Sequence, residues 1–542
     1  MNSRRRLFIG RYLKLIILLA YLLFEFGSTE LSAQNGNTLY GIDAGANITT
    51  ADSIVAVGVQ AAYQTTLGAR HVMLGTKAGY NLNFNPTSTV GTPTSQGGSV
   101  HIGYLAGYGT TSADDNVFIG DQAGYVTTGG DNVFLGSRSG VSNTSGFDNV
   151  FVGNLSGAKN TTGISNVFVG DHSGYDNTTG SNNVFVGKFS GYENTTGIQN
   201  TFVGRSAGSA NTSGNYNTAI GYKALTQNVS GYENTIIGFE AGYQNSYAYQ
   251  NTFVGAYAGD SNNATNSTNN AQRNTYLGAY AGHTNQTGSD NTGMGYDANF
   301  TGLSNSNTVF IGASTNAGAN GVTVIGHQAS GTGENAIAIG KQSVSSASNA
   351  IAIGYQSNAN NANEIVFGNA SHTSIGGAVN WTATSDERFK TDIREDVVGL
   401  EFINALRPVT YSFKTKKLFE KDGESLPDDL KLAVEQKDAI RYTGFLAQEV
   451  EKAALDTDFD FSGIDRKVDV SNQNQTSFTY GLRYAEFVVP LVKATQELST
   501  KVEILERKSN DQQEQLKKYE AALSEIMNEL EQLDQSLPVI SN

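Results

Sequence analysis

The sequence predicts a mainly β protein that consists of a long parallel β-solenoid, a small α+β domain and a C-terminal coiled coil. Three observations indicate this. Glycines recur at a fixed short period, charged residues become frequent only after Asn380, and apolar residues near the C-terminus follow a heptad pattern. The expected parts are a leader at residues 1–33, repeats at 34–380, a domain at 381–490 and a coiled coil at 491–537.

The leader has the features of a secretory signal. Basic residues up to Lys14 precede an apolar run from Leu15 to Phe24, and a small-residue patch ends at Ala33. An apolar run of this length is too short to span a bilayer of about 30 Å as a helix. We expect export and cleavage after Ala33, which gives a secreted or cell-surface protein with no remaining membrane span. The alternative is an uncleaved membrane anchor at Leu7–Phe24.

One unit recurs along the first part of the chain. It contains Asn, a β-prone triplet such as Val-Phe-Val, Gly, two variable residues, Ser/Ala-Gly and a turn such as Asn-Thr-Thr-Gly. The glycine after the triplet recurs mostly every 17 residues from Gly103 to Gly312, then every 14 residues to Gly368. Because so short a unit cannot bury its own apolar face, successive coils must stack. The segment from Leu82 to Gly98 interrupts the period and is expected to be an insertion.

Aromatic residues follow the same period. The middle position of the triplet is expected in the core, and in many coils it is a phenylalanine: Phe118, Phe134, Phe151, Phe168, Phe185 and Phe202. Tyrosines that follow a glycine form either an exposed ladder for glycans or contacts between chains: Tyr125, Tyr175, Tyr192, Tyr232 and Tyr243. The six histidines lie singly in different units, so we expect them at the surface or between chains rather than as metal ligands.

The composition excludes several functions. The chain has no cysteine, which excludes disulfides, thiolate metal sites and a cysteine nucleophile. Its net charge is -15 and it has no basic stripe, so a nucleic acid is not an expected partner. Calcium-binding nonapeptides are missing, and no paired carboxylates recur at one coil position as a glycosidase requires. No cofactor and no metal site are expected.

Two of the 14-residue units carry a family resemblance. Asn335-Ala-Ile-Ala-Ile-Gly340 and Asn349-Ala-Ile-Ala-Ile-Gly354 resemble the head repeats of trimeric autotransporter adhesins of the YadA-like class. The resemblance implies a left-handed parallel β-roll in which three chains pack side by side. That family ends in a membrane β-barrel, whereas this chain has no C-terminal run of alternating ten-residue strands. We therefore do not expect an autotransporter.

A second resemblance covers residues 383–505. Its phrases are Thr384-Ser-Asp-Glu-Arg-Phe-Lys-Thr-Asp-Ile393, Leu406-Arg-Pro-Val-Thr-Tyr411 and Gly444-Phe-Leu-Ala-Gln-Glu-Val450, followed by a helix from Tyr484 into the heptads. In this order they resemble the peptidase S74 domain, the C-terminal intramolecular chaperone of phage tailspikes and endosialidases. The resemblance implies trimerisation followed by self-cleavage.

The same resemblance implies a serine-lysine dyad at Ser385 and Lys390, with Asp386 and Arg388 in orienting or structural roles. A lysine acts as a base only where burial or nearby cations favour its neutral form. The spacing of five places the two side chains on different faces of a regular helix. Ser385 must therefore precede the helix in an extended or turn segment, or meet a lysine of a neighbouring chain. From the hexapeptide alone, Ser385/Asp386 forms a helix N-cap beside a solvated Lys390.

The expected scission lies between Thr384 and Ser385. Attack of the Ser385 hydroxyl on the Thr384 carbonyl passes through a five-membered ring and gives an ester that water can open. Scission directly after Ser385 is the alternative. The dyad cleaves either its own chain or another chain of the trimer, and the sequence leaves both routes open.

The heptads predict a parallel coiled coil, and its three-stranded state is implied by the S74 resemblance. The alternative is one amphipathic helix docked on its own domain. The seam positions are Leu498, Val502, Leu505, Ser509, Gln512, Leu516, Tyr519, Leu523, Ile526, Leu530 and Leu533.

Together these features predict an exported, homotrimeric, adhesin-like fibre that binds a glycan or a cell-surface receptor and is matured by a self-cleaving chaperone. Two alternatives remain. One is a tailspike-like fibre that degrades or binds a glycan, and the other is a structural stalk with an uncleaved trimerising cap.

Overall fold

The computed structural model divides into two compact units, residues 1–369 and 370–542. It describes residues 36–49, 51, 53–65, 70–82, 98–111, 115–263, 270–378, 381–420, 426–469 and 477–536. The expected signal segment and its cleavage site lie outside these residues. None of the helices in the described ranges is long and apolar enough to cross a membrane.

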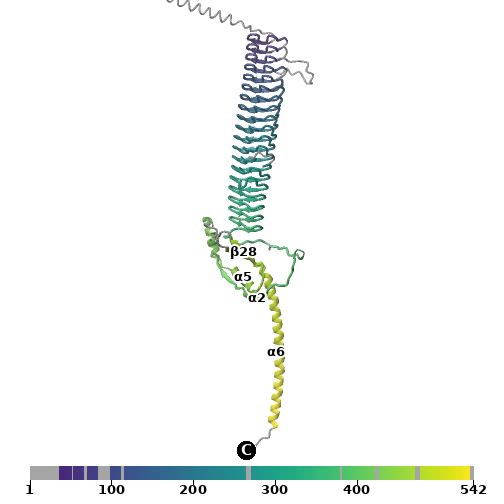
Figure 1. Ribbon diagram of the computed structural model, residues 1–542, viewed down its shortest axis with the longest axis vertical. Coiled ribbons are helices and arrows are strands. Elements are labelled where there is room, and N and C mark those ends of the chain that lie inside the picture. The colour runs from purple at the N-terminus through teal and green to yellow at the C-terminus, as the bar shows by residue number, and fades with distance from the viewer. Residues whose placement is uncertain are drawn as a thin grey trace, which may run out of the picture. The chain divides into compact units, whose positions relative to one another are not determined.

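The first unit is a parallel β-solenoid, as predicted, and Figure 1 shows it as a stack of short coils. Each coil adds one three-residue strand to a single twenty-stranded sheet. Strands on either side of an insertion pair directly, as Val72 with Val100 does across 83–97, so the ladder is not interrupted. The strands are β1 (Thr38–Tyr40), β2 (Val55–Val57), β3 (Val72–Leu74), β4 (Val100–Ile102), β5 (Val117–Ile119), β6 (Val133–Leu135), β7 (Val150–Val152), β8 (Val167–Val169), β9 (Val184–Val186), β10 (Thr201–Val203), β11 (Thr218–Ile220), β12 (Thr235–Ile237), β13 (Thr252–Val254), β14 (Thr275–Leu277), β15 (Thr292–Met294), β17 (Val309–Ile311), β19 (Thr323–Ile325), β21 (Ile337–Ile339), β23 (Ile351–Ile353) and β25 (Ile365–Phe367).

A second parallel sheet of five strands begins where the period shortens. Its first strand lies in the last 17-residue coil, four residues after Gly295, and the other four strands lie at the same position of the 14-residue coils. In the earlier coils this position belongs to the turn that follows the strand. The strands are β16 (Asn299–Phe300), β18 (Asn316–Ala317), β20 (Ser330–Gly331), β22 (Val344–Ser345) and β24 (Asn358–Ala359).

The middle residue of each triplet points into the solenoid. The six predicted core phenylalanines are fully buried, and their rings stack in register at 4.8–5.0 Å, with successive ring planes within about 17° of parallel. From Phe134 to Phe185, each ring is covered by the rings of the coils before and after it. One chain thus closes its own core without help from another.

Asparagine side chains form two further buried ladders. Asn166 receives a hydrogen bond from the Asn183 main-chain N–H and donates one to the Asn149 side chain. In the turns, the Asn177 amide donates to Asn160 of the previous coil at 2.7 Å and to the carbonyl of Gly180 at 3.0 Å. The local bond closes the Asn177-Thr-Thr-Gly180 turn. The bond between coils pairs buried polar groups that otherwise have no partner.

Two histidines are placed differently from the prediction of a surface or inter-chain position. His101 is fully buried at the phenylalanine position of its triplet and stacks on Phe118 at 4.9 Å. His71 is 3% exposed at the asparagine position, where its Nδ1 accepts a hydrogen bond from the Ser99 main-chain N–H. Both residues replace a ladder residue of similar shape, which is why the core accepts them.

The corner after each strand requires glycine. Gly153 has a φ of +140°, and a Cβ built there would lie 2.3 Å from the carbonyl oxygen of Gly170 in the next coil. Both the backbone conformation and the close approach of the neighbouring coil exclude a side chain. This explains why the glycine that closes the triplet recurs throughout.

The second unit is a small α/β region with a long C-terminal helix. The last solenoid strand ends at Phe367 and this unit begins at Ala370, ahead of the expected boundary at Trp381. Its elements are η1 (Glu387–Phe389), α2 (Leu400–Ala405), β26 (Val409–Tyr411), α3 (Thr415–Glu420), η2 (Asp428–Leu430), α4 (Lys431–Asp438), β27 (Tyr442–Gly444), α5 (Ala447–Asp456), β28 (Ile464–Asp469), β29 (Ser477–Leu482), η3 (Tyr484–Phe487) and α6 (Val488–Ser536). Its core is formed by Phe402, Val450, Ala453, Ala454, Phe461 and Phe487.

Helix α6 is continuous over 49 residues and begins three residues before the expected coiled coil. Its first turns pack on the unit: Ala494 is buried, and the Glu497 carboxylate accepts a hydrogen bond from the Leu400 main-chain N–H at 2.8 Å. From Leu498 to Gln535 every residue is exposed. The alternative of an amphipathic helix that docks on its own domain therefore applies only to the first turns of α6.

Candidate functional site

The predicted dyad residues meet within one chain. Lys390 Nζ donates a hydrogen bond to Ser385 Oγ at 2.8 Å. Ser385 lies in an irregular segment directly before the 3₁₀-helix η1, and Lys390 is the residue that ends this helix. The tight turn of η1 brings positions five apart together, which a regular α-helix does not do. The expected segment before a helix is thus present.

Asp386 and Arg388 hold this turn. The Asp386 carboxylate accepts a hydrogen bond from the Arg388 main-chain N–H at 2.9 Å and caps η1. It also pairs with the Arg388 guanidinium, with an Arg388 Nη2 to Asp386 Oδ2 distance of 2.6 Å. The hydrogen bonds from Arg388 keep the pKa of the Asp386 carboxyl below its usual range. The helix N-cap expected from the hexapeptide alone is therefore Asp386, and the Ser385 hydroxyl contacts the lysine instead.

The site is open to solvent in the single chain. Thr384, Ser385 and Lys390 are all exposed, and η1 contains no buried residue. The neighbouring apolar side chains Phe389 and Ile393 are 75% and 68% exposed. The lysine donates in the observed contact, whereas a lysine base must accept the serine proton. A second surface that excludes water from this segment would favour that reversed role.

The other two predicted phrases lie side by side. Strand β26 pairs antiparallel with β27, so that Tyr411 faces Tyr442 and Val409 faces Gly444. Beyond the strands, Arg407 forms a two-pronged ion pair with Glu449 of α5. The phrases separated by more than thirty residues thus form one structural unit.

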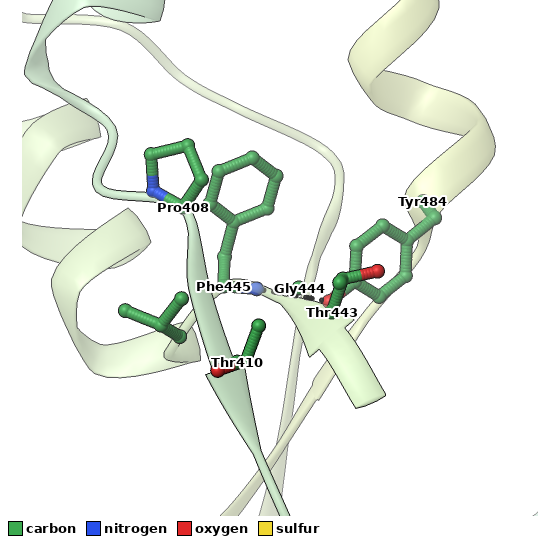
Figure 2. Close-up of a pocket in the computed structure, with 7 residues that line it drawn as sticks. Pro408, Thr410, Thr443, Gly444, Phe445 and Tyr484 are labelled. Carbon is green, nitrogen blue, oxygen red and sulfur yellow. Dashed lines mark hydrogen bonds between the residues drawn. The ribbon is translucent and has the colours of Figure 1, made fainter. Parts of the chain in front are cut away.

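A cavity of about 690 Å³ lies beside this strand pair (Figure 2). Two residues of its lining are joined by a hydrogen bond, which the Tyr484 hydroxyl accepts from the Phe445 main-chain N–H at 3.1 Å. The lining is threonine, proline, valine, glycine and two aromatic rings, without a carboxylate, histidine or lysine. This lining suits apolar contact rather than acid-base chemistry.

The solenoid carries an exposed apolar stripe that sequence reasoning missed. The third residue of every strand in the large sheet points outward and is apolar in all twenty coils, and it is partly exposed or exposed in each. Alternation along the triplet was the available signal: the first and third residues must face opposite to the buried middle one. A continuous apolar stripe on a protein surface usually marks an interface.

The predicted tyrosine positions are less suited to glycans. Tyr125 stacks face to face on Tyr108 at 5.3 Å, and Tyr175 stacks in the same way on Tyr192. Tyr232 belongs to another coil position and stacks on Tyr249. The ring of Tyr243 is partly exposed, and the Lys223 ammonium lies over it at 5.7 Å from the ring centroid. Faces that cover one another cannot also stack on a sugar ring.

Across the described ranges, no cluster of three or more His, Asp or Glu residues is arranged to hold a metal ion. Comparison with known proteins identifies one region. Residues 385–459 match the peptidase S74 family, described as chaperone of endosialidase. The match begins at the predicted nucleophile and covers the dyad, the β26–β27 pair and α5. No curated protein matches the chain.

Proposed function

We propose that the chain forms an exported homotrimeric fibre in which the second unit aligns three solenoids and then releases itself by scission beside Ser385. The observation that carries this proposal is the hydrogen bond between Lys390 and Ser385 at the first residues of the S74 match. The leader expected at 1–33 would direct export, and the solenoid would be the working product at the cell surface.

The exposed apolar surfaces support assembly. The outward stripe of the large sheet runs along all twenty coils, and the seam of α6 is exposed from Leu498 onward. Both surfaces lose contact with water if three chains pack together. Removing apolar surface from water stabilises the assembly by about 25 cal/mol per Å². A long helix with this heptad pattern also holds the C-termini together, which raises the local concentration of the solenoids.

The chemistry follows from the geometry of the dyad. Covering Phe389 and Ile393 by another chain would desolvate Lys390 and favour its neutral form. The neutral amine then accepts the Ser385 hydroxyl proton, and the Ser385 oxygen attacks the Thr384 carbonyl carbon. The bond from that carbon to the Ser385 nitrogen breaks, the lysine returns the proton to the nitrogen, and an ester remains. Water hydrolyses the ester to a Thr384 carboxylate and a new N-terminus at Ser385.

This scheme makes cleavage depend on assembly, because the single chain leaves the lysine exposed. The test is the intact mass of the chain from Gln34 to Asn542 beside a Ser385→Ala variant, with the oligomeric state of each measured by light scattering. A separate fragment starting at Ser385 in the parent alone supports the proposal. A fragment starting at Asp386 would show that the scissile bond is the one between Ser385 and Asp386.

Two further results would change the assignment. Full-length trimers of both proteins would reduce the domain to an uncleaved trimerising cap. Cleavage of a monomer would contradict the role of assembly. A Lys390→Arg variant is a useful second control, since it keeps a donor near Ser385 but cannot lose its proton at neutral pH.

A further inference from the structure

A run of exposed and partly exposed aromatic rings lies on the middle of the solenoid, at positions other than those of the stacked tyrosines described above. We define the aromatic strip as Tyr222, Phe239, Tyr257, Tyr280 and Tyr296. Each stands one or two residues after the glycine that closes a strand, in five successive coils. The strip therefore offers one aromatic ring for each coil along the axis of the stack.

The strip is not a closed stack. Tyr222 with Phe239 and Tyr257 with Tyr280 are parallel pairs, at 5.1 and 5.0 Å. The contacts between Phe239 and Tyr257 and between Tyr280 and Tyr296 are edge to face, at 65° and 81°. In the core, parallel stacking covers the ring faces, whereas the edge-to-face contacts of the strip leave ring faces uncovered. Phe239, Tyr280 and Tyr296 are 43%, 38% and 61% exposed.

Acceptors for hydrogen bonds flank the rings. Glu240 and Asp260 follow strip residues closely, and Asp297 follows Tyr296 directly. The Asp260 Oδ1 atom is buried without a hydrogen-bond partner, although buried carboxylate oxygens ordinarily have one. Burial also raises the pKa of the Asp260 carboxyl. The acceptors that a ligand can reach are Glu240 and Asp297, whose side chains are 24% and 44% exposed, because the buried Asp260 Oδ1 atom is closed to the surface.

We propose that the aromatic strip binds a neutral polysaccharide chain laid along the solenoid. The C–H face of a pyranose ring packs on an aromatic face, and its hydroxyls donate to the flanking carboxylates. A linear polymer of repeated units suits a row of rings repeated once per coil. The three carboxylates disfavour an anionic polymer, because they outnumber the nearby cations Lys223 and Arg205.

The test is affinity electrophoresis of the full chain in gels that contain hydroxyethylcellulose, galactomannan, laminarin or alginate. At least one of the three neutral polymers slows the parent protein, and alginate does not. The variant Phe239→Ala/Tyr280→Ala/Tyr296→Ala loses roughly tenfold or more in affinity, a factor expected when contacts worth about 1.4 kcal/mol are removed. Asp297→Ala, which removes the exposed carboxylate beside Tyr296, weakens binding by a smaller factor.

The matched control is Tyr63→Ala/Tyr80→Ala/Tyr108→Ala, which removes three tyrosines whose rings stack on one another and leaves binding unchanged. Circular dichroism checks folding, and if the strip variant does not fold, Tyr296→Ala alone replaces it because that ring is the most exposed. Failure of all three neutral polymers, equal loss in the control, or preference for alginate overturns the proposal. So does loss of oligomers in the strip variant by light scattering, which would assign the strip to contacts between copies.

Discussion

At the scale of single residues, the burial of His101 predicts that the solenoid loses stability in acid. Neither nitrogen of its buried ring has a hydrogen-bond partner in the described structure, and burial lowers its pKa to about 3. The pKa of His71 is lowered to about 4 by burial and by Arg70, against a smaller opposing effect of Asp115. The folded chain therefore prefers both rings neutral. Their contribution is complete above about pH 6.5 and is lost as the pH falls toward 3.

A His101→Phe variant should remove part of this dependence. Phenylalanine occupies this position in neighbouring coils, and it leaves no buried nitrogen to protonate. The hydrogen-exchange protection factors of residues 98–111, which are corrected for the intrinsic pH dependence of exchange, are expected to fall in the parent between pH 7 and pH 4 and to change much less in the variant. An equal fall in both proteins would show that the histidine does not control these coils.

Gly153 tests the corner that every coil repeats. Gly153→Ala places a Cβ against the Gly170 carbonyl and forces a conformation that costs about 1–3 kcal/mol for a residue other than glycine. We expect a lower melting temperature and faster hydrogen exchange in the adjacent coils. The control is Gly376→Ala, where an added Cβ has no neighbour within 4 Å. A similar small effect of both substitutions would contradict the steric argument.

Residue patterns predicted some positions well and others poorly. The core phenylalanines were predictable because strand residues alternate and the period is fixed. The ladder role of Asn166 was not, because an asparagine beside a turn gives the same local signal whether its amide bonds within the coil or to the next one. His71 and His101 were misplaced for a related reason: each looks isolated in the sequence, and only the coil register shows that it fills a buried ladder.

At the scale of elements, the seam of α6 should decide assembly. Leu516 and Leu523 lie one heptad apart and are 57% and 61% exposed in the single chain. The double variant Leu516→Asp/Leu523→Asp places like charges in the expected interface, so trimers should be lost and cleavage at Ser385 should stop with them. Light scattering and gel analysis of the same samples measure both effects.

The matched control is Ser524→Asp/Asn528→Asp, which adds the same charge to α6 outside the seam. It should assemble and cleave like the parent. If the seam variant still forms trimers, the solenoid stripe alone is sufficient for assembly. If it forms monomers that cleave, the dependence of the dyad on assembly is wrong.

Element boundaries show a similar limit of prediction. Strand positions followed from the glycine period, and the helix from its heptads. Ser385 was expected either to precede a helix in an extended or turn segment or to meet a lysine of a neighbouring chain. It precedes a 3₁₀-helix capped by Asp386, and Lys390 of the same chain reaches it. The second sheet was not predicted, because Ser330-Gly331 carries no strand signal and pairs only through the coil register. The second unit begins at Ala370, before the charge pattern changes at Trp381.

At the scale of the whole molecule, scission should make the product persist for kinetic reasons. Three solenoids with near-identical coils can pair out of register, and non-local β pairing is slow. The α6 helices would correct this during assembly, but they leave with the second unit after cleavage. A cleaved fibre that is unfolded in guanidinium and diluted should therefore not recover its trimers, whereas the uncut Ser385→Ala protein should.

Trimer recovery by light scattering is the measurement, at equal protein concentration and after equal times. Equal recovery of the two proteins would place the information for alignment in the solenoid stripe itself. Recovery of neither would mean that assembly needs a factor outside this chain. The uncut protein is therefore the necessary comparison, because it shows whether the chain can assemble by itself.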